Sequence, residues 1–378
     1  MKPSRIQSID ALRGLVMIVM ALDHIRDFFH FDTSLHDPLD LNSTSLVLFL
    51  TRWITHFCAP TFIFLTGLSA YLYGQKHTRK ELSRFLLTRG LWMIFLEVSV
   101  VAFGWFFSFR IHNPVLMVIW AIGCSMVFLS VMVRFPYIIV TVVGLLIVLL
   151  HNLGDSINVA SGTLLHPVWT LLHQQGRIVV FPGLTLYCFY PILPYLGLIC
   201  TGYAAGKLFA SDMVQEKRKR FLLITGLSCI GVFILLRLAN VYGDPRPWVV
   251  QTSLTNTILS FINCNKYPVS LLFALMTLGP SILFLGFMEG IQNLFTSVLV
   301  IIGKVPLFYY LLHIYLIHTL AMLSEDVNPA SFMHITQRFH LWAVYLIWIG
   351  TVSALYFPCK WYGHYKAAHP EKWWLSYL

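Results

Sequence analysis

Apolar runs of about 20 residues recur along the whole of this chain, which has 378 residues. An α-helix needs a run of that length to cross the hydrocarbon core of a bilayer, which is about 30 Å thick. Hydrophobic residues make up 57% of the sequence and charged residues only 11%, against about 25% charged residues in a typical soluble domain. The runs leave no room for a separate soluble domain. We therefore predict an all-α fold, a single integral membrane domain over residues 1–378.

The limits of the runs predict about ten membrane spans. They lie near residues 9–29, 46–74, 84–109, 114–133, 136–152, 186–208, 221–242, 267–288, 295–322 and 340–358. An amphipathic stretch around residues 163–182 is a candidate eleventh half-span, which would lie in the interface or re-enter the membrane.

Basic residues gather in alternate connections between these spans. They are concentrated in residues 75–90, in residues 207–220 and in the tail after residue 358, whereas the connection at residues 32–45 contains aspartates and no Lys or Arg. Cytoplasmic loops carry the excess of Lys and Arg in membrane proteins. We therefore expect a multi-pass protein of the inner membrane with both termini in the cytoplasm. The formal net charge of +10 follows from this pattern and does not indicate a nucleic-acid partner.

The first predicted span is unusual because it contains six ionisable side chains. They are Asp10, Arg13, Asp23, His24, Arg26 and Asp27. Each such group costs about 2.5–3.5 kcal/mol at the centre of a membrane helix, so these groups usually face a polar interior. At 100° per residue, Asp10, Arg13, Met17, Met20, His24 and Asp27 fall within one arc of the helix.

The side chains at the two ends of this stripe suit two different roles, anion binding and proton transfer. Asp10 and Arg13 are spaced to pair on one face, and the Arg13 guanidinium suits a phosphate group at the cytoplasmic end. About 16 Å along the helix, His24 has the chemistry of a general base, with Asp23 or Asp27 available to orient it. The alternative is an ion-pair network that only holds helices together.

Other spans contain polar side chains at membrane depth. Arg52 and His56 lie one turn apart in the second span and could line the same cavity as His24 or form a structural pair. Glu97 interrupts the third span. In the ninth span, Pro306 is expected to kink the helix, and His313 is a candidate site residue or a hydrogen-bonded structural histidine.

The sequence offers little support for several other site types. The seven cysteines are scattered singly, and the histidines lack the spacing of metal ligands, so we expect no metal site. The sequence has no GxSxG motif, no P-loop and no GxGxxG motif after a strand.

Three segments resemble a known family. RIQSIDALRGLVMIVMALDH, HFCAPTFIFLTGLSA and KVPLFYYLLHIYLIH are similar to bacterial relatives of heparan-α-glucosaminide N-acetyltransferase, within the transmembrane acyltransferase superfamily. The resemblance implies a bundle of ten or eleven spans that takes an acyl group from cytosolic acetyl-CoA or another acyl-CoA. It implies transfer to a glycan, glycolipid or other acceptor beyond the membrane, a modification of the cell envelope, with a membrane-embedded histidine in the site.

The resemblance also suggests which residues carry the reaction. Asp10 and Arg13 match the opening motif, and His24 matches the histidine that closes the first span in the superfamily. Lysosomal members have an asparagine near this position and a candidate histidine in the first outer loop, where this chain has His30 and His36. The expected catalytic set is His24, Asp27, Asp23, His36, His56 and His313. The expected donor-binding set is Asp10, Arg13, Arg52, Arg84, Arg89 and Lys304.

Two other functions remain open on the sequence. In a proton-coupled transporter or a flippase for a lipid-linked glycan, the intramembrane Asp, Glu, His and Lys would form a proton relay. In a non-catalytic membrane partner, the charges would be structural. The clustering of charge in one N-terminal helix and the lack of a visible internal repeat favour the acyltransferase over the transporter. The acceptor, the acyl chain and the oligomeric state, a homodimer included, stay open.

Overall fold

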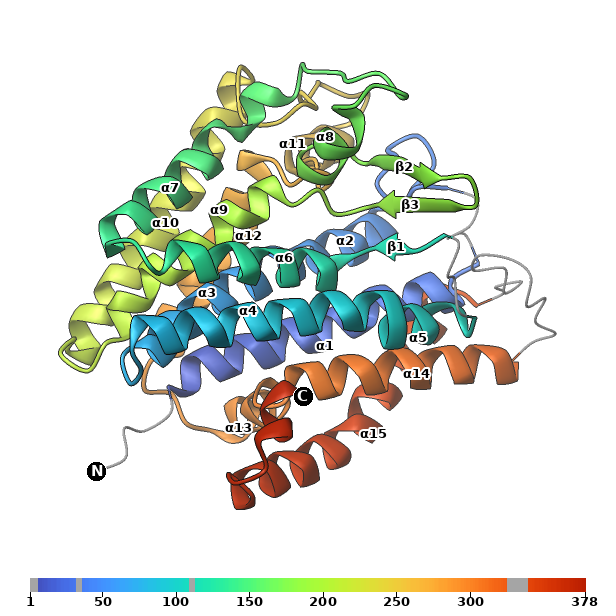
Figure 1. The fold of residues 1–378 in the computed structure, drawn as a ribbon. Coiled ribbons are helices and arrows are strands. Elements are labelled where there is room, and N and C mark those ends of the chain that lie inside the picture. Colours follow the sequence, from blue (N-terminus) through green and yellow to red (C-terminus); the bar gives the residue numbers. More distant parts are fainter. Residues whose placement is uncertain (1–5, 32–35, 109–112, 325–338) are drawn as a thin grey trace.

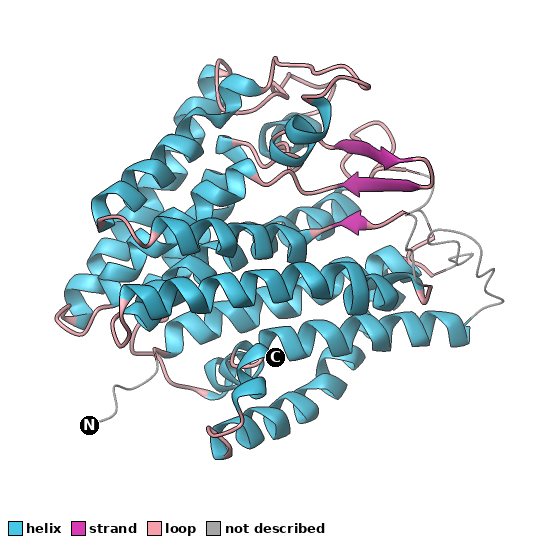
Figure 2. Cartoon of the chain, in the orientation of Figure 1, coloured by secondary structure: helices cyan, strands magenta, loops and turns pink. Residues whose placement is uncertain are grey.

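The protein is a bundle of helices with a small sheet at one end (Figures 1 and 2). The structure is a computed structural model, and it describes residues 6–31, 36–108, 113–324 and 339–378. Several long helices run side by side, and the three strands lie at the end of the bundle far from the N-terminus. We call these two ends the N-terminal end, where Gln7 begins the first helix, and the sheet end.

The bounds of the elements are as follows. The helices are α1 (Gln7–Phe29), α2 (Leu46–Ile54), α3 (Cys58–Gly74), α4 (Arg79–Leu96), α5 (Ala102–Phe106), α6 (Val118–Met132), α7 (Tyr137–Leu150), α8 (His166–Leu172), α9 (Leu193–Ala205), α10 (Gln215–Ala239), α11 (Leu254–Ile262), α12 (Leu271–Phe287), α13 (Leu294–Gly303), α14 (Pro306–Ser324) and α15 (Leu341–Ala368). The strands are β1 (Val115–Leu116), β2 (Gly176–Phe181) and β3 (Leu184–Cys188). Helical turns at Thr55–Phe57 and Glu97–Val101 join α2 to α3 and α4 to α5.

Within the described residues, six continuous helical segments are long and apolar enough to cross a membrane. They are Leu46–Gly74, Arg79–Phe106, Tyr137–Gly154, Gln215–Ala239, Pro306–Ser324 and Leu341–Ala368. Three apolar helices are shorter, namely α6, α12 and α13. With 23 residues, α1 is also long enough to cross the membrane. It is not one of these six apolar segments, because it contains several charged side chains. A multi-pass helical membrane protein is confirmed, and the number of ten spans stays a prediction.

The structure is mostly helical, but the all-α prediction is wrong at three short strands, β1, β2 and β3. The candidate half-span forms the short helix α8 and the strand β2, which pairs antiparallel with β3, and β3 pairs parallel with β1. Gly183 turns the chain between β2 and β3 with a φ of +95°, a conformation that glycine adopts without strain. The segments on either side of this glycine are rich in β-branched and aromatic residues, which favour strands.

The predicted ninth span is two helices. The chain breaks between α13 and α14 at Lys304 and Val305, because Pro306 has no N–H to continue the helical hydrogen bonds. The predicted kink is therefore confirmed and is a full break. The break leaves the Gly303 carbonyl available to a side chain from another helix, and it accepts a hydrogen bond from Arg13 at 3.2 Å.

Helix α1 lies at the centre of the packing, in contact with α3, α12, α13, α14 and α15. Its backbone comes very close to α13, because a Cβ added at Gly14 would lie 1.9 Å from the Leu299 carbonyl oxygen. A Cβ at Gly303 would lie equally close to the Asp10 carbonyl oxygen. Small residues allow such close helix contacts in membranes.

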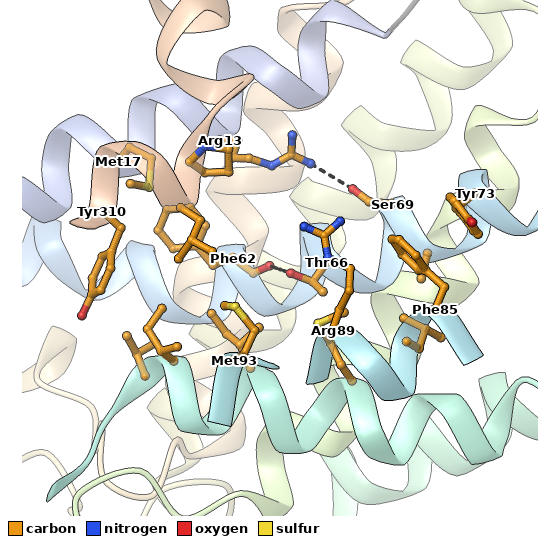
Figure 3. A pocket seen from close by; sticks show the side chains of 18 of the residues that line it. Arg13, Met17, Phe62, Thr66, Ser69, Tyr73, Phe85, Arg89, Met93 and Tyr310 are labelled. Carbon is orange, nitrogen blue, oxygen red and sulfur yellow. Dashed lines mark hydrogen bonds between the residues drawn. The ribbon is translucent and has the colours of Figure 1, made fainter. Parts of the chain in front are cut away.

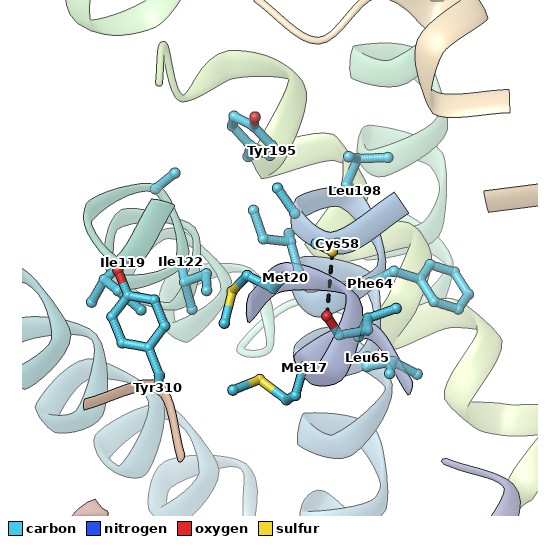
Figure 4. Packing of buried hydrophobic residues seen from close by; sticks show 14 of the residues in the cluster. Met17, Met20, Cys58, Phe64, Leu65, Ile119, Ile122, Tyr195, Leu198 and Tyr310 are labelled. Atoms are coloured by element: carbon cyan, nitrogen blue, oxygen red, sulfur yellow. Dashed lines mark hydrogen bonds between the residues drawn. The ribbon is translucent and has the colours of Figure 1, made fainter. Parts of the chain in front are cut away.

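A second close crossing joins α3 to α9. A Cβ added at Gly67 would lie 1.9 Å from the Ile199 carbonyl oxygen, and one at Gly202 would lie 2.0 Å from that of Phe64. The small residues Gly67 and Gly202 therefore let the backbones of α3 and α9 come into contact. Apolar side chains fill the space around these crossings, and Cys58 on α3 donates a hydrogen bond to the Val16 carbonyl of α1 at 3.3 Å (Figure 4).

Candidate functional site

An elongated cavity of about 560 Å³ lies between α1, α3, α4, α6 and α14 (Figure 3). It is mostly apolar, and its charged lining residues are Arg13 and Arg89. Arg13, Met17 and Met20 all line it, so the structure confirms that this part of the predicted stripe shares one face of α1. Figure 3 shows Tyr310 at one end of the cavity and Tyr73 with Phe85 at the other.

The Arg13 guanidinium joins three helices beside this cavity. Its Nη1 donates to Asp10 Oδ1 at 2.8 Å and to the Gly303 carbonyl at 3.2 Å, and its Nη2 donates to Ser69 Oγ at 2.9 Å. The predicted pairing of Asp10 with Arg13 is confirmed. Because its donors already bond to protein groups, Arg13 is well placed to fix α1 against α3 and α13.

Arg89 has a different environment at the Tyr73 end of the cavity. Its guanidinium lies over the rings of Phe85 and Tyr377, with 5.1 and 5.7 Å from Cζ to the ring centroids. Among the described residues, no carboxylate forms an ion pair with it. A guanidinium held by aromatic rings keeps its N–H donors for an anion, so Arg89 can bind a phosphate group.

At the opposite end of the cavity, two histidines lie behind the ring of Tyr310. Tyr310 lines the cavity, and its ring centroid lies 5.3 Å from that of His313 and 6.2 Å from that of His24. Trp105 Nε1 donates to Tyr310 Oη at 3.4 Å, and the Trp105 ring meets His24 edge to face at 4.8 Å. His24 does not line the cavity itself and lies behind these aromatic rings.

His24 and His313 contact each other directly, although 289 positions separate them in sequence. His24 Nδ1 lies 2.7 Å from His313 Nε2, and His313 Nδ1 lies 3.1 Å from the Tyr309 carbonyl oxygen. A carbonyl oxygen only accepts, so we assign the His313 proton to Nδ1 and its lone pair to Nε2. His24 then donates from Nδ1, and the lone pair of the neutral ring lies on His24 Nε2.

Both aspartates near His24 bond to arginines. Asp23 accepts a hydrogen bond from Arg52 and forms an ion pair with Arg26 at 3.0 Å. Asp27 accepts from Arg26. The hydrogen bond that fixes the His24 ring goes to His313. Among the described residues, no bond joins the Asp23 or Asp27 carboxylate to the His24 ring.

His56 is fully buried close to this ion-pair network. Its ring lies 5.1 Å from that of Phe273, and neither ring nitrogen has a hydrogen-bond partner among the described residues. Arg52 and His56 belong to the sheet end of the α2–α3 segment, and neither lines the large cavity. Their shared position at the sheet end agrees with the spacing, but the structure places Arg52 outside this cavity.

Three further predicted residues lie apart from the cavity. Arg84 on α4 and His36 beyond α1 are exposed. Lys304 lines a separate cavity beside α15. These positions do not join the group formed by Arg13, Arg89, His24 and His313.

The sequence did not single out several residues that shape this site. Ser69 receives the Arg13 hydrogen bond, and Trp105 packs against His24. The sequence marked Ser69 only as one of the small residues that permit close helix packing, and nothing in the apolar segment around Trp105 distinguishes that residue. Glu97 was visible as a carboxylate in an apolar run, and its Oε2 accepts from the Trp120 N–H at 2.7 Å in the first turn of α6. Acidic groups stabilise a helix N-terminus, so Glu97 has a structural partner here.

Comparison with known proteins gives one family match. Residues 5–237, more than half of the chain, match the family model described as heparan-alpha-glucosaminide N-acetyltransferase, catalytic. The matched region contains His24, Arg13, Arg89 and Trp105, and it ends before α14, which supplies Tyr310 and His313. A search of curated proteins found no match.

Proposed function

Since the chain belongs to the heparan-alpha-glucosaminide N-acetyltransferase family, we propose that it is a membrane-embedded acyltransferase. It moves an acetyl or other acyl group from acyl-CoA on the cytosolic side to a glycan or other acceptor on the outer side. The observation that carries this proposal is the cavity with Arg89 toward one end and Tyr310 at the other, next to the His24–His313 pair. Acyl-CoA supplies an activated thioester, and the chain supplies binding groups and a base.

The lining of the cavity fits the parts of such a donor. Arg89 presents a guanidinium without a carboxylate partner among the described residues, which suits a phosphate group. Beyond it, apolar side chains such as Met93, Met126 and Ile122 line the cavity toward Tyr310. Flexible methionine side chains adapt to a long, irregular ligand such as a pantetheine arm.

His24 acts as the base in this proposal. Its Nε2 takes the proton from the acceptor hydroxyl or amine while the oxygen or nitrogen of the acceptor bonds to the acyl carbonyl carbon. The carbon–sulfur bond breaks, and His24 returns the proton to the departing sulfur. The hydrogen bond from Nδ1 to His313 holds the ring in the tautomer that this role requires. An alternative route has two steps. The lone pair of His24 Nε2 first bonds to the acyl carbonyl carbon, and the carbon–sulfur bond breaks to release the CoA thiolate. The acceptor oxygen or nitrogen then bonds to that carbon, the carbon–nitrogen bond to His24 breaks, and the acceptor proton passes through Nε2 to the thiolate.

Tyr310 is suited to stabilise the negative charge that develops on the carbonyl oxygen. Its hydroxyl oxygen accepts from Trp105, so the hydroxyl proton is free to point toward the cavity that this residue lines. A positioned donor of this kind typically contributes about 10²–10³-fold to the rate of acyl transfer.

The experiment is transfer of radiolabel from acetyl-CoA into cell-envelope material by membranes that contain the protein. We expect transfer by the wild type and a loss of about 10²–10⁴-fold for His24→Ala, because a general base contributes a factor of this size. The matched control is His36→Ala, since His36 is exposed and lies apart from the cavity. Binding of acyl-CoA in detergent should be nearly the same in all three proteins.

Other outcomes assign the base elsewhere or reject the proposal. Active His24→Ala with inactive His36→Ala or His30→Ala would place the base beyond the end of α1. If these variants are all active, His56 and His313 are tested next. Label transfer that survives the loss of each of these histidines would contradict the histidine mechanism. An absence of label transfer by wild-type membranes across a panel of envelope acceptors would contradict the acyltransferase proposal itself.

A further inference from the structure

A second cavity, of about 430 Å³, lies between the α13–α14 break and the last turns of α15. Its lining residues are Ile301, Lys304, Val305, Cys359, Lys360, Gly363, His364, Lys366 and Ala367. We propose that this cavity binds the phosphate headgroup of an anionic phospholipid such as phosphatidylglycerol. Nothing in the acyl-transfer chemistry above uses these residues.

The side chains that line this cavity are basic or apolar, which favours the binding of an anion. Its lining contains three lysines and a histidine, with no Asp or Glu among the described residues that line it. Lys366 donates to the Leu378 backbone oxygen at 2.5 Å, so the charge offered to a ligand comes from Lys304 and Lys360. The side chains of Lys304, Lys360 and His364 are exposed. Basic pockets between membrane helices on the cytoplasmic side are sites where anionic headgroups bind.

The surroundings of the cavity favour a lipid over a soluble anion. Ile301, Val305 and Cys359 give it an apolar wall, which can receive the glycerol and the first carbons of the chains. On the outer surface of α15, Phe357 and Trp361 are 71% and 64% exposed, as expected for side chains that face lipid. Tryptophan is enriched at the level of the headgroups, so Trp361 places the neighbouring lysines at that depth.

The second cavity is separate from the donor cavity. The two share no lining residue, and they lie on either side of the α13–α14 break. Lys304 and Val305 face the second cavity, whereas Pro306 and Leu307 line the first. A ligand in the second cavity is therefore not the acyl donor, and this inference does not depend on the proposed acyl transfer.

The test measures lipid retained by the purified full-length protein. The protein is reconstituted in vesicles of phosphatidylcholine with phosphatidylglycerol, extracted in mild detergent and examined by native mass spectrometry. We expect the wild type to retain phosphatidylglycerol in preference to phosphatidylcholine. Lys304→Gln/Lys360→Gln should reduce this retention by about fivefold for each lysine, since one basic residue near an anionic membrane surface contributes about 1 kcal/mol.

A matched control separates this site from general surface charge. Lys80→Gln/Lys217→Gln removes two exposed lysines outside the cavity lining, and it should retain phosphatidylglycerol as the wild type does. Gly363→Leu tests the cavity without a change in charge. A Cβ at Gly363 meets only Val305 Cγ1 at 3.9 Å, so leucine fits on the helix and fills the cavity. We expect Gly363→Leu to reduce retention by about as much as the double lysine variant.

Two competition measurements distinguish a lipid phosphate from the phosphate of a soluble anion. Inorganic phosphate or CoA, each added at millimolar concentration, should leave the retained phosphatidylglycerol unchanged. The proposal is overturned if either soluble anion displaces the lipid, or if phosphatidylcholine is retained equally well. It is also overturned if both Gly363→Leu and Lys304→Gln/Lys360→Gln retain phosphatidylglycerol as the wild type does.

Discussion

At the scale of single residues, the proposed site depends on a contact between two histidine rings. His313 donates to a backbone carbonyl and accepts from His24, so one ring determines the tautomer of the other. This arrangement resembles the way in which a carboxylate orients a histidine, but the orienting group is a second imidazole. Asp23 and Asp27, which could have filled that role, bond to Arg52 and Arg26.

The first prediction concerns His313 as a positioning residue. His313→Leu removes the acceptor for His24 Nδ1, so we expect acyl transfer to fall by about 10–100-fold with little change in KM for acyl-CoA. His313→Asn retains a side-chain acceptor and should recover part of the rate. The pH–rate profile should shift in His313→Leu, because the His24 ring loses its fixed tautomer. A purely structural role would instead lower the thermal stability of both variants and leave the profile unchanged.

The second prediction compares two arginines of α4. Arg89→Gln should weaken acyl-CoA binding by about 10–100-fold, because a hydrogen bond to a charged group contributes about 1.5–3 kcal/mol. Arg84→Gln is the matched control, since Arg84 is exposed on the same helix and does not line the cavity. Isothermal titration in detergent measures both affinities. Equal affinities for the two variants would exclude Arg89 from donor binding.

The sequence predicted the local part of this site and missed the distant part. Asp10 and Arg13 are three residues apart on one helix, so their pairing followed from helical spacing. His24 and His313 were both candidates, but their contact joins α1 to α14 and depends on how the bundle closes. Spacing within one helix contains no information on that contact.

At the scale of elements, glycine determines how closely the central helices approach. Gly14 on α1 and Gly303 on α13 bring two backbones into contact at the level where Arg13 bonds to the Gly303 carbonyl. The same contact therefore fixes α1 and presents the end of α13 to the Arg13 side chain. The break before Pro306 is required for this geometry, because α13 and α14 do not form one continuous helix.

The third prediction tests this crossing. Gly14→Ala would place a Cβ 1.9 Å from a backbone carbonyl oxygen that no side-chain rotation can move. We expect a loss of about 1–3 kcal/mol in the free energy of unfolding, as for other overpacked cores, and a lower thermal midpoint in detergent. Gly350→Ala on α15 is the control, because a Cβ there meets nothing within 4 Å. Equal midpoints for the two variants would contradict a tight α1–α13 contact.

The secondary structure shows where the pattern of apolar residues misleads. Hydropathy placed helices in most of the long runs, but around residues 163–182 it did not separate a strand from an amphipathic half-span. A short apolar run fits either element, and the choice depends on the turn at Gly183 and on the pairing of β3 with the distant β1. Tertiary pairing between β1, β2 and β3 therefore decided where the fold departs from the all-α prediction.

At the scale of the whole molecule, the polar groups follow α1 from one end of the bundle to the other. Arg13 lines the cavity near the start of α1, and His24 lies about three turns further along the same helix, beside Asp23 and its partner Arg52. This order matches a reaction in which donor and acceptor approach the histidines from opposite sides. That interpretation requires the N-terminal end to face the cytoplasm.

The last prediction tests this orientation by cysteine accessibility. Lys80→Cys and Lys217→Cys lie in the basic segments at the N-terminal end, and Leu164→Cys lies in the α7–α8 connection at the sheet end, where Leu164 is 96% exposed. Basic residues mark the cytoplasmic side, so a membrane-impermeant maleimide should label only Leu164→Cys in intact cells. The two lysine positions should become labelled after permeabilisation, measured against the wild-type background of native cysteines. Labelling of Lys80→Cys or Lys217→Cys in intact cells would reverse the topology. Arg89 and its cavity would then face away from cytosolic acyl-CoA, and the proposed direction of acyl transfer would be wrong.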